Sequence, residues 1–239
     1  MTPLPMSPPT PLKRAKRGAR PVRKRSDPAG GYQKSVEKRK AIVDAGAKML
    51  ARYGYAEAKI SDIAREVGIH AGSLYYYFPS REDLVQEVML TSLERMLLQF
   101  SKSLESKVAG LSALDRLEAF IRAILARRAA AKDDYLRAYM RNYNQVPPSM
   151  RKVLAAKRHE ARWTVERLIR EAQVSERLPA SIDTGLAALF VIGAATWVGM
   201  WYEASGPKTP QEISDTFVTL ILHGLLGASG PGSESRARR

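Results

Sequence analysis

The spacing of apolar residues between Ile60 and Phe78 predicts two short helices joined by a tight turn. Each helix would bury one stripe against the other and against a supporting helix, as a helix-turn-helix unit requires. Gly68 stands at the corner, where it can adopt the positive φ that ends the first helix. Ala64 is small where the two helices would cross most closely. The apolar stripe consists of Ile60, Ile63, Val67, Ile69, Leu74 and Tyr77.

The side chains outside this stripe give the second helix, 69–78, a small, aromatic and hydrogen-bonding face. The second helix of a helix-turn-helix unit lies in the major groove of duplex DNA, where base edges present hydrogen-bonding groups and methyl groups. The sequence therefore predicts a DNA-reading surface that consists of His70, Ala71, Gly72, Ser73, Tyr75 and Tyr76.

Helical periodicity continues on both sides of this unit, and no sustained period-2 run predicts a strand. We expect a supporting helix over 37–53, which Gly54 ends. A second long helix would begin at Ser80, which with Asp83 resembles a capping box. Later apolar stripes predict helices over 112–131, 133–143, 149–172, 184–204 and 210–226.

These elements predict an all-α fold with a three-helix helix-turn-helix domain over 36–82 and a larger helical domain over 83–227. Residues 1–35 hold seven of the 14 prolines and a run of Lys and Arg, so we expect a disordered basic tail. Residues 228–239 are rich in Gly, Ser and Arg, and we expect a flexible C-terminal tail.

The formal net charge of +15 favours a polyanionic partner such as nucleic acid. Residues 1–36 carry +8 of it, since nine Lys and Arg face only Asp27 there. One interpretation is a basic arm that adds phosphate contacts beside a DNA-binding unit; the other is a solvated tail without a role.

The first residues lack the apolar core of a signal peptide, so we expect a cytoplasmic protein. The absence of cysteine excludes disulfides; it leaves the compartment undetermined but fits a reducing cytosol. Residues 184–202 carry no charge and are long enough to span a membrane. Glycines at 185, 193 and 199 interrupt the stretch, and no stop-transfer flank follows it. We interpret it as a fully buried helix and expect no membrane partner.

Catalytic constellations are missing from the sequence. The three histidines, His70, His159 and His223, lack metal-ligand spacing, and no GxSxG, P-loop or HExxH motif occurs. We therefore expect no enzymatic activity, no metal site and no cofactor.

Residues 38–85 resemble the TetR family of transcriptional repressors. The resemblance is carried by the helix end AKMLARYGY, the segment SDIAREVGIHAGSLYYYF and the following PSREDL. It implies an all-helical homodimer whose larger domain binds a ligand. The last two long helices, 184–204 and 210–226, would form a four-helix dimer interface, which also explains how an uncharged helix stays in water.

The resemblance also implies DNA contacts, residue by residue. His70 and Ala71 stand where a Ser-Lys pair is common, and Gly72 would let the backbone approach the bases. Lys59 replaces a frequent Thr cap and would contact phosphate, with the Ser61 hydroxyl as a substitute cap for a helix that starts slightly later. The side chains with hydroxyl, imidazole or cationic groups would bind phosphates or bases. They are Lys59, Ser61, His70, Ser73, Tyr75, Tyr76 and Arg81.

The final helices, TWVGMWYEASGPKTPQEISDTFVTLILHGLLG, resemble the branch that regulates fatty-acid and sterol catabolism, where acyl-CoA thioesters are frequent inducers. Such a ligand needs an apolar slot and cations at its mouth. The residues expected to bind it are Arg137, Tyr139, Tyr143, Trp163, Phe190 and Trp197. The alternative is that these aromatics are core and the arginines are solvated.

The function expected from these observations is a ligand-responsive repressor that binds a pseudo-palindromic operator as a dimer. A small hydrophobic effector, with acyl-CoA as the favoured class, would release it through the helix that follows Ser80. One alternative is a sensor of lipophilic drugs that controls efflux. Another, from a different class, is a non-specific nucleoid or membrane-surface binding protein in which the basic tail dominates.

Overall fold

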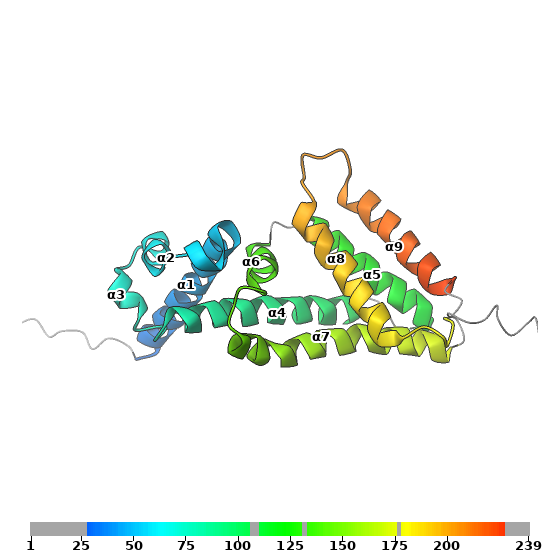
Figure 1. Ribbon diagram of the computed structural model, residues 1–239, viewed down its shortest axis with the longest axis horizontal. Coiled ribbons are helices and arrows are strands. Elements are labelled where there is room, and N and C mark those ends of the chain that lie inside the picture. Colours follow the sequence, from blue (N-terminus) through cyan, green and yellow to red (C-terminus); the bar gives the residue numbers. More distant parts are fainter. Residues whose placement is uncertain (1–27, 106–109, 131–132, 176–177, 228–239) are drawn as a thin grey trace, which may run out of the picture. The chain divides into compact units, whose positions relative to one another are not determined.

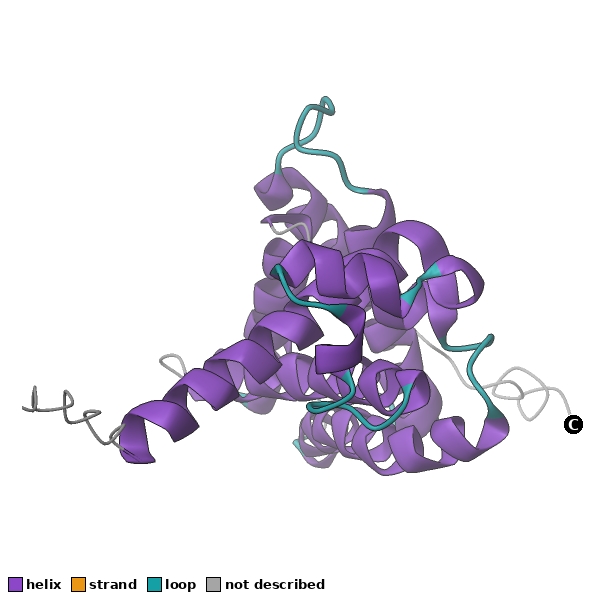
Figure 2. Cartoon of the chain, turned by 90° about the vertical axis from the view of Figure 1, so that its left-hand side faces the viewer, coloured by secondary structure: helices purple, strands orange, loops and turns teal. Residues whose placement is uncertain are grey.

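The structure is a computed structural model that describes residues 28–105, 110–130, 133–175 and 178–227. Every regular element in these ranges is a helix (Figure 2), as the sequence predicts. The predicted basic cluster at 13–25 and the C-terminal tail at 228–239 lie outside the described residues. The helices are α1 (Pro28–Glu57), α2 (Ile60–Val67), α3 (Ala71–Leu74), α4 (Arg81–Glu105), α5 (Ala113–Ala130), α6 (Asp134–Asn142), α7 (Pro148–Val174), α8 (Thr184–Trp201) and α9 (Pro210–Leu226).

Helix α1 is longer than expected at both ends. It begins at Pro28 and not at residue 37, so residues 28–35 are helical and not disordered. Proline is favoured in the first turn of a helix, and Gln33, Lys34 and Glu37 have good helix propensity, although Gly30 and Gly31 do not. At the other end Gly54 has φ 83° and bends the chain, as its predicted role as a stop requires, but one further turn to Glu57 follows the bend.

Two hydrophobic clusters of buried residues form the interior of the segment from Glu37 onward. One joins α1–α3 to the first half of α4, and it includes Tyr135 and Ala138 of α6 and Leu154 of α7. The other joins α5, α8 and α9, which lie side by side (Figure 1), to the rest of α4 and α7. The expected division at residues 82 and 83 is therefore not a clean one, because α6 and α7 help to fill the first cluster.

Local capping explains where several of these helices begin. The Ser80 hydroxyl accepts from the Asp83 backbone N–H at 3.0 Å, which confirms the predicted cap of α4. The Asp133 carboxylate caps α6, and Thr209 and Glu212 form a full capping box at the start of α9.

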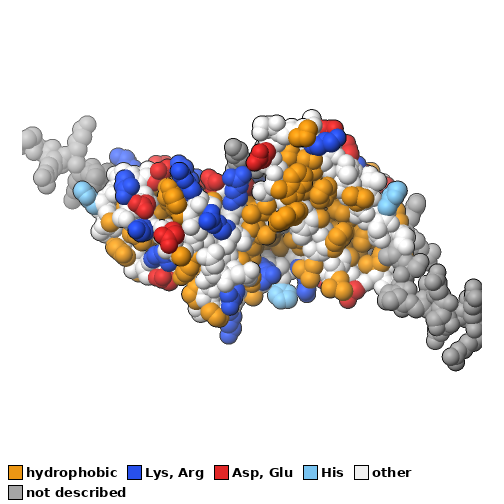
Figure 3. Space-filling view, turned by 45° about the horizontal axis from the view of Figure 1, so that its top comes forward, with side chains coloured by type: hydrophobic (Ala, Val, Ile, Leu, Met, Phe, Trp, Pro, Cys, Tyr) orange, Lys and Arg blue, Asp and Glu red, His pale blue; other side chains and the backbone are white. Residues whose placement is uncertain are grey.

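Helix α8 is apolar on all sides, yet its outer face is open to solvent. Among the described residues it is the one helix long and apolar enough to cross a membrane by length and composition. Only 28% of that window is buried within the chain, so the expected full burial does not occur within one subunit. Figure 3 shows apolar side chains gathered over this part of the molecule. The exposed large apolar residues of these two helices are Leu186, Leu189, Phe190, Trp197 and Trp201 of α8 and Leu220 and Leu226 of α9.

Candidate nucleic-acid interface and effector cavity

Helices α2 and α3 meet at Gly68, as the sequence predicts. Gly68 is left-handed, with φ 70° and ψ 41°, and its N–H donates to the Arg65 carbonyl at 3.1 Å. The next N–H, from Ile69, donates to the Ala64 carbonyl at 2.9 Å. These bonds satisfy the last carbonyls of α2 and fix the direction in which α3 leaves it.

Buried side chains hold this pair against α1 and α4. Ile63, Ala64, Leu74 and Phe78 are each at most 3% exposed. The Arg39 guanidinium of α1 lies 4.5 Å from the Phe78 ring centroid. One face of the α2–α3 pair is therefore buried against α1 and α4, and the opposite face is exposed to solvent.

The DNA-reading surface predicted from the sequence is the open face. His70, Ala71, Gly72 and Ser73 are exposed, and Tyr75 and Tyr76 are 51% and 83% exposed. Tyr77 is half-buried and packs against the core, with its ring edge-on to Tyr76 at 5.2 Å.

Helix α3 itself is shorter than the expected 69–78. It ends at Leu74, and residues 75–77 continue as turns in which the Tyr76 and Tyr77 N–H groups donate three residues back. A residue that precedes proline disfavours helical geometry, and Pro79 follows Phe78.

Arg81 does not point outward to a phosphate as expected. Its guanidinium donates to the Tyr55 carbonyl and to the Ala58 carbonyl, the latter at 3.2 Å, and lies 4.5 Å from the Tyr55 ring centroid. The Tyr55 carbonyl lies in the last turn of α1 and the Ala58 carbonyl in the connection to α2, where helix-end acceptors need donors. Arg81 therefore stabilises the junction between α1 and α2 and does not extend toward a phosphate.

Two expectations about the start of α2 come out differently. Lys59 is the N-cap, exposed and without a side-chain capping bond, so its ammonium is available for phosphate. The expected substitute cap by Ser61 is wrong, because α2 begins at Ile60 and Ser61 lies inside the first turn. The Lys59 carbonyl, which accepts from Asp62 and Ile63, sets this start.

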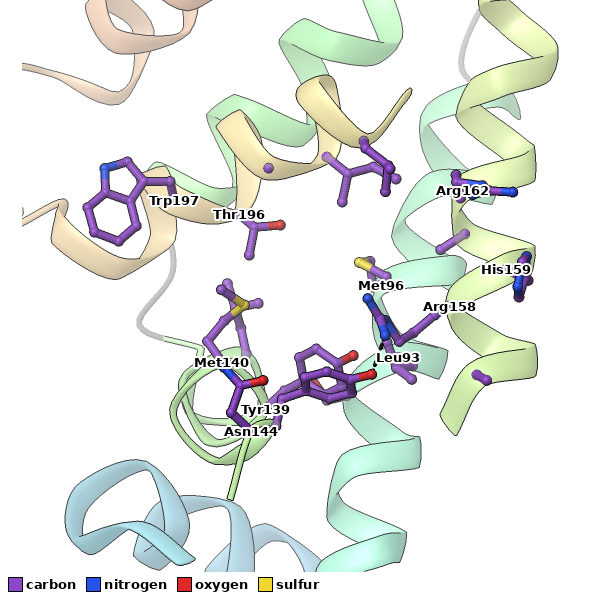
Figure 4. Close-up of a pocket in the computed structure, with 18 residues that line it drawn as sticks. Leu93, Met96, Tyr139, Met140, Asn144, Arg158, His159, Arg162, Thr196 and Trp197 are labelled. Atoms are coloured by element: carbon purple, nitrogen blue, oxygen red, sulfur yellow. Dashed lines mark hydrogen bonds between the residues drawn. The ribbon is translucent and has the colours of Figure 1, made fainter. Parts of the chain in front are cut away.

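A cavity of about 500 Å³ lies between α4, α6, α7 and α8 (Figure 4). Figure 4 shows Thr196 and Trp197 of α8 on one side and Arg158 and Arg162 of α7 on the other. Apolar lining comes from Leu93 and Met96 of α4, Leu136 and Met140 of α6, and Leu189 and Ile192 of α8. The cavity is therefore lined mainly by apolar side chains, with the arginines Arg158 and Arg162 on one side.

Tyr139 and Tyr143 also line the cavity, and Tyr143 is hydrogen-bonded to its cationic side. The rings of Tyr139 and Tyr143 lie 5.4 Å apart, and the Arg158 guanidinium donates to the Tyr143 hydroxyl. Burial raises the pKa of Tyr139 to about 12, although Arg158 opposes the shift. The Tyr139 hydroxyl therefore keeps its proton at neutral pH and can donate a hydrogen bond to a ligand.

Half of the expected effector residues line this cavity. Tyr139, Tyr143 and Trp197 do, whereas Arg137, Trp163 and Phe190 do not. Trp163 and Phe190 are 60% and 58% exposed, and Trp197, at the edge of the cavity, is 61% exposed. Arg158 and His159 were missed, although Arg158 and Arg162 have the i, i+4 spacing that places two side chains on one face of a helix.

Helix α6 lines the cavity and also binds α1 directly. The Tyr135 hydroxyl donates to Asp44 at 2.7 Å, and the buried Asn142 amide donates to the Leu50 carbonyl at 3.2 Å. Arg141 donates to the Arg52 carbonyl at 2.8 Å. Helix α6 thus connects the lining of the cavity to α1, the helix against which α2 and α3 pack.

The Asp44 carboxylate joins three helices at this contact. Besides Tyr135, it binds Lys40 at 2.8 Å and Arg95 of α4 at 3.3 Å. Burial raises the pKa of Asp44, but the hydrogen bonds from Lys40 and Tyr135 outweigh it and the pKa lies below its ordinary value. The carboxylate therefore stays charged at neutral pH.

Comparison with protein families decides the identity of the fold. Residues 42–88 match the family described as bacterial regulatory proteins of the tetR family, and residues 110–225 match the tetracyclin repressor-like C-terminal domain. The chain belongs to the TetR family. It is accordingly a helix-turn-helix transcriptional regulator and not an enzyme.

Relatives of full length support this membership in the TetR family. The HTH-type transcriptional repressor KstR2 of Mycolicibacterium smegmatis is 25% identical over 199 residues, which cover 82% of this chain and 94% of KstR2. KstR2 of Rhodococcus jostii is 26% identical over 204 residues, 83% and 96% of the two chains.

Solved structures agree in fold. AibR in complex with isovaleryl coenzyme A and operator DNA has a TM-score of 0.67 at 18% identity, over 77% of this chain and 98% of AibR. The ketosteroid transcriptional regulator KstR2 of Mycobacterium tuberculosis has a TM-score of 0.64 at 20% identity, over 79% and 94%.

Proposed function

We propose that this TetR-family regulator is a repressor that binds a pseudo-palindromic operator as a homodimer and is released by an acyl-CoA thioester. The observation that carries the proposal is the cavity with apolar walls, a cationic side and a wall, α6, that is hydrogen-bonded to α1. A ligand there acts on the DNA-binding part without touching DNA.

Operator binding is supported by the exposed face of α3 on a buried anchor. The face offers hydroxyls and a backbone open at Gly72, which suit phosphates and base edges. DNase I footprinting of the full chain on the DNA upstream of its own gene tests the proposal. One discrete protected region is expected; diffuse protection, or binding to anionic lipid vesicles instead, would favour a non-specific nucleoid or membrane-surface protein.

The homodimer is supported by the apolar face of α8 and α9. A monomer would leave Leu186, Phe190 and Leu220 more than half exposed, whereas a second copy related by two-fold symmetry would cover them. Because the second copy would cover these side chains, α8 could stay in the cytoplasm without inserting into a membrane.

The effector class is supported by the cavity and by relatives. A volume of about 500 Å³ accommodates a medium-sized acyl group, and Arg158 and Arg162 suit the thioester and phosphates of coenzyme A. AibR is a fold relative whose solved complex holds isovaleryl coenzyme A and operator DNA. KstR2 is named as a ketosteroid regulator, which fits a bulky apolar acyl portion.

Release would follow two routes from the cavity. Helix α4 carries Leu93 and Met96 into the cavity and is ion-paired to α1 through Arg39 and Glu87 at 2.6 Å. Helix α6 adds the direct bonds to α1. A ligand that favours one position of these helices shifts the separation of the two α3 helices in the dimer.

Replacing Arg162 with Met should weaken acyl-CoA binding about tenfold or more, since one charge-assisted hydrogen bond is lost. Isothermal titration with a series of acyl-CoAs measures it, and the melting temperature should rise with each binder. Arg137→Met is the matched control, because Arg137 lies outside the cavity lining. Equal loss in both variants, or stabilisation by lipophilic drugs alone, would refute the effector class.

Tyr76→Phe should weaken binding to operator and to random DNA alike, by about tenfold, because only a hydroxyl that donates to phosphate is removed. Fluorescence anisotropy on both DNAs at one salt concentration measures it. Tyr53→Phe, an exposed tyrosine of α1, serves as the control. A loss restricted to the operator would mean that Tyr76 contacts a base.

A further inference from the structure

The DNA-reading surface lacks the side chains that usually identify three of the four bases. From His70 to Tyr76 there is no arginine, lysine, asparagine, glutamine, aspartate or glutamate. Guanine is most often read by Arg or Lys, adenine by Asn or Gln, and cytosine by Asp or Glu. Arg65 of the adjoining α2 is ion-paired with Asp62 at 2.7 Å. Base recognition at the centre of this surface therefore needs another chemistry.

Hydroxyls remain on this surface, but they do not select one base; the base-selective chemistry that remains is apolar contact, which the first residue of α3 can make. Ala71 begins the helix and is exposed, and the N-terminal residues of a recognition helix are those that meet base edges. Its neighbour Gly72 has no side chain, and no other part of the chain lies within 4 Å of the point where one would begin, so the chain beside Ala71 is open. The partner of an apolar side chain in the major groove is the C5-methyl group of thymine.

We propose that each operator half-site presents a thymine to Ala71 and that its C5-methyl group is the recognised feature. The neighbouring Ser73 hydroxyl bonds to either kind of base edge and adds register without selecting the base. Specificity at this position thus comes from a methyl contact and not from a guanidinium on guanine. The inference rests on the proposed operator binding and names the base chemistry of that same surface.

The test removes one methyl group at a time. The operator is first selected from random duplexes with the full-length protein, and each thymine of a half-site is then replaced by deoxyuridine, which keeps every hydrogen-bonding group. Anisotropy at fixed salt should give about fourfold weaker binding at one thymine, and about 15-fold when both half-sites are changed. Replacement of the other thymines should leave the affinity unchanged.

Ala71→Gly provides the second half of a double-mutant cycle. The variant should bind the thymine operator about 15-fold more weakly and should lose no further affinity with deoxyuridine. Ala56→Gly, an exposed alanine of α1, is the matched control and should keep the full sensitivity to deoxyuridine. Ala71→Gln supplies an amide that reads adenine, so selection with it should move the preferred base at that position to adenine.

The outcomes separate this inference from the proposed function. A discrete operator that binds equally well with deoxyuridine at every thymine overturns the methyl contact and leaves the repressor intact. A guanine fixed opposite Ala71 overturns it as well. If selection yields no preferred sequence, operator binding itself fails, and the inference fails with it.

Discussion

Gly72→Glu should abolish operator binding, with at least a hundredfold loss of affinity, and should leave the fold intact. The residue lies in α3, and a side chain there would meet nothing within 4 Å, so the chain accommodates glutamate. In the complex, however, the carboxylate would face the phosphates and fill the space between backbone and bases. A like charge in an interface costs several kcal/mol, and the dimer carries two of them.

Anisotropy on operator DNA and a thermal melt measure the two sides of this prediction. The melting temperature should be equal or higher, because glutamate forms helix more readily than glycine. Leu98→Glu adds the same charge at a residue of α4 that is 55% exposed, and it should bind operator normally. If Gly72→Glu binds operator as tightly as the unmodified chain, α3 does not read DNA.

Phe190→Asp should convert the protein to a monomer and reduce operator affinity at least a hundredfold. Phe190 lies on the exposed apolar face of α8 and is 58% exposed in the single chain. A buried carboxylate without a partner is strongly unfavourable in an apolar interface. Once the subunits separate, each half-site is bound alone, and the advantage of linked binding, typically 10²–10⁴, disappears.

Light scattering gives the mass of the variant, and footprinting gives its occupancy of the operator. Val174→Asp is the matched control: Val174 is 80% exposed at the end of α7 and belongs to neither α8 nor α9, so this variant should remain dimeric. A dimeric Phe190→Asp variant would refute the assignment of α8 and α9 to the interface. A monomer that still binds with full affinity would refute the need for two linked half-sites.

Local chemistry determined much of this protein from the sequence alone. Gly68 ends α2 because few other residues adopt a positive φ, and Ser80 begins α4 because its hydroxyl satisfies a backbone N–H. The stripe at Ile63 and Leu74 fixes which face of the helix-turn-helix unit is buried. The exposed surface from His70 to Tyr76 follows directly, since only one face remains.

Tertiary packing decided the residues whose roles depend on distant partners. A helix between several neighbours has more than one buried face, so its period does not tell whether Trp163 or Arg158 points into a cavity. The sequence predicts Arg81 as a phosphate ligand, but in the folded chain its guanidinium donates to the carbonyls of Tyr55 and Ala58. The bond between Tyr135 and Asp44 joins residues 91 apart in sequence. Such contacts arise only when the chain folds, because no local pattern specifies them.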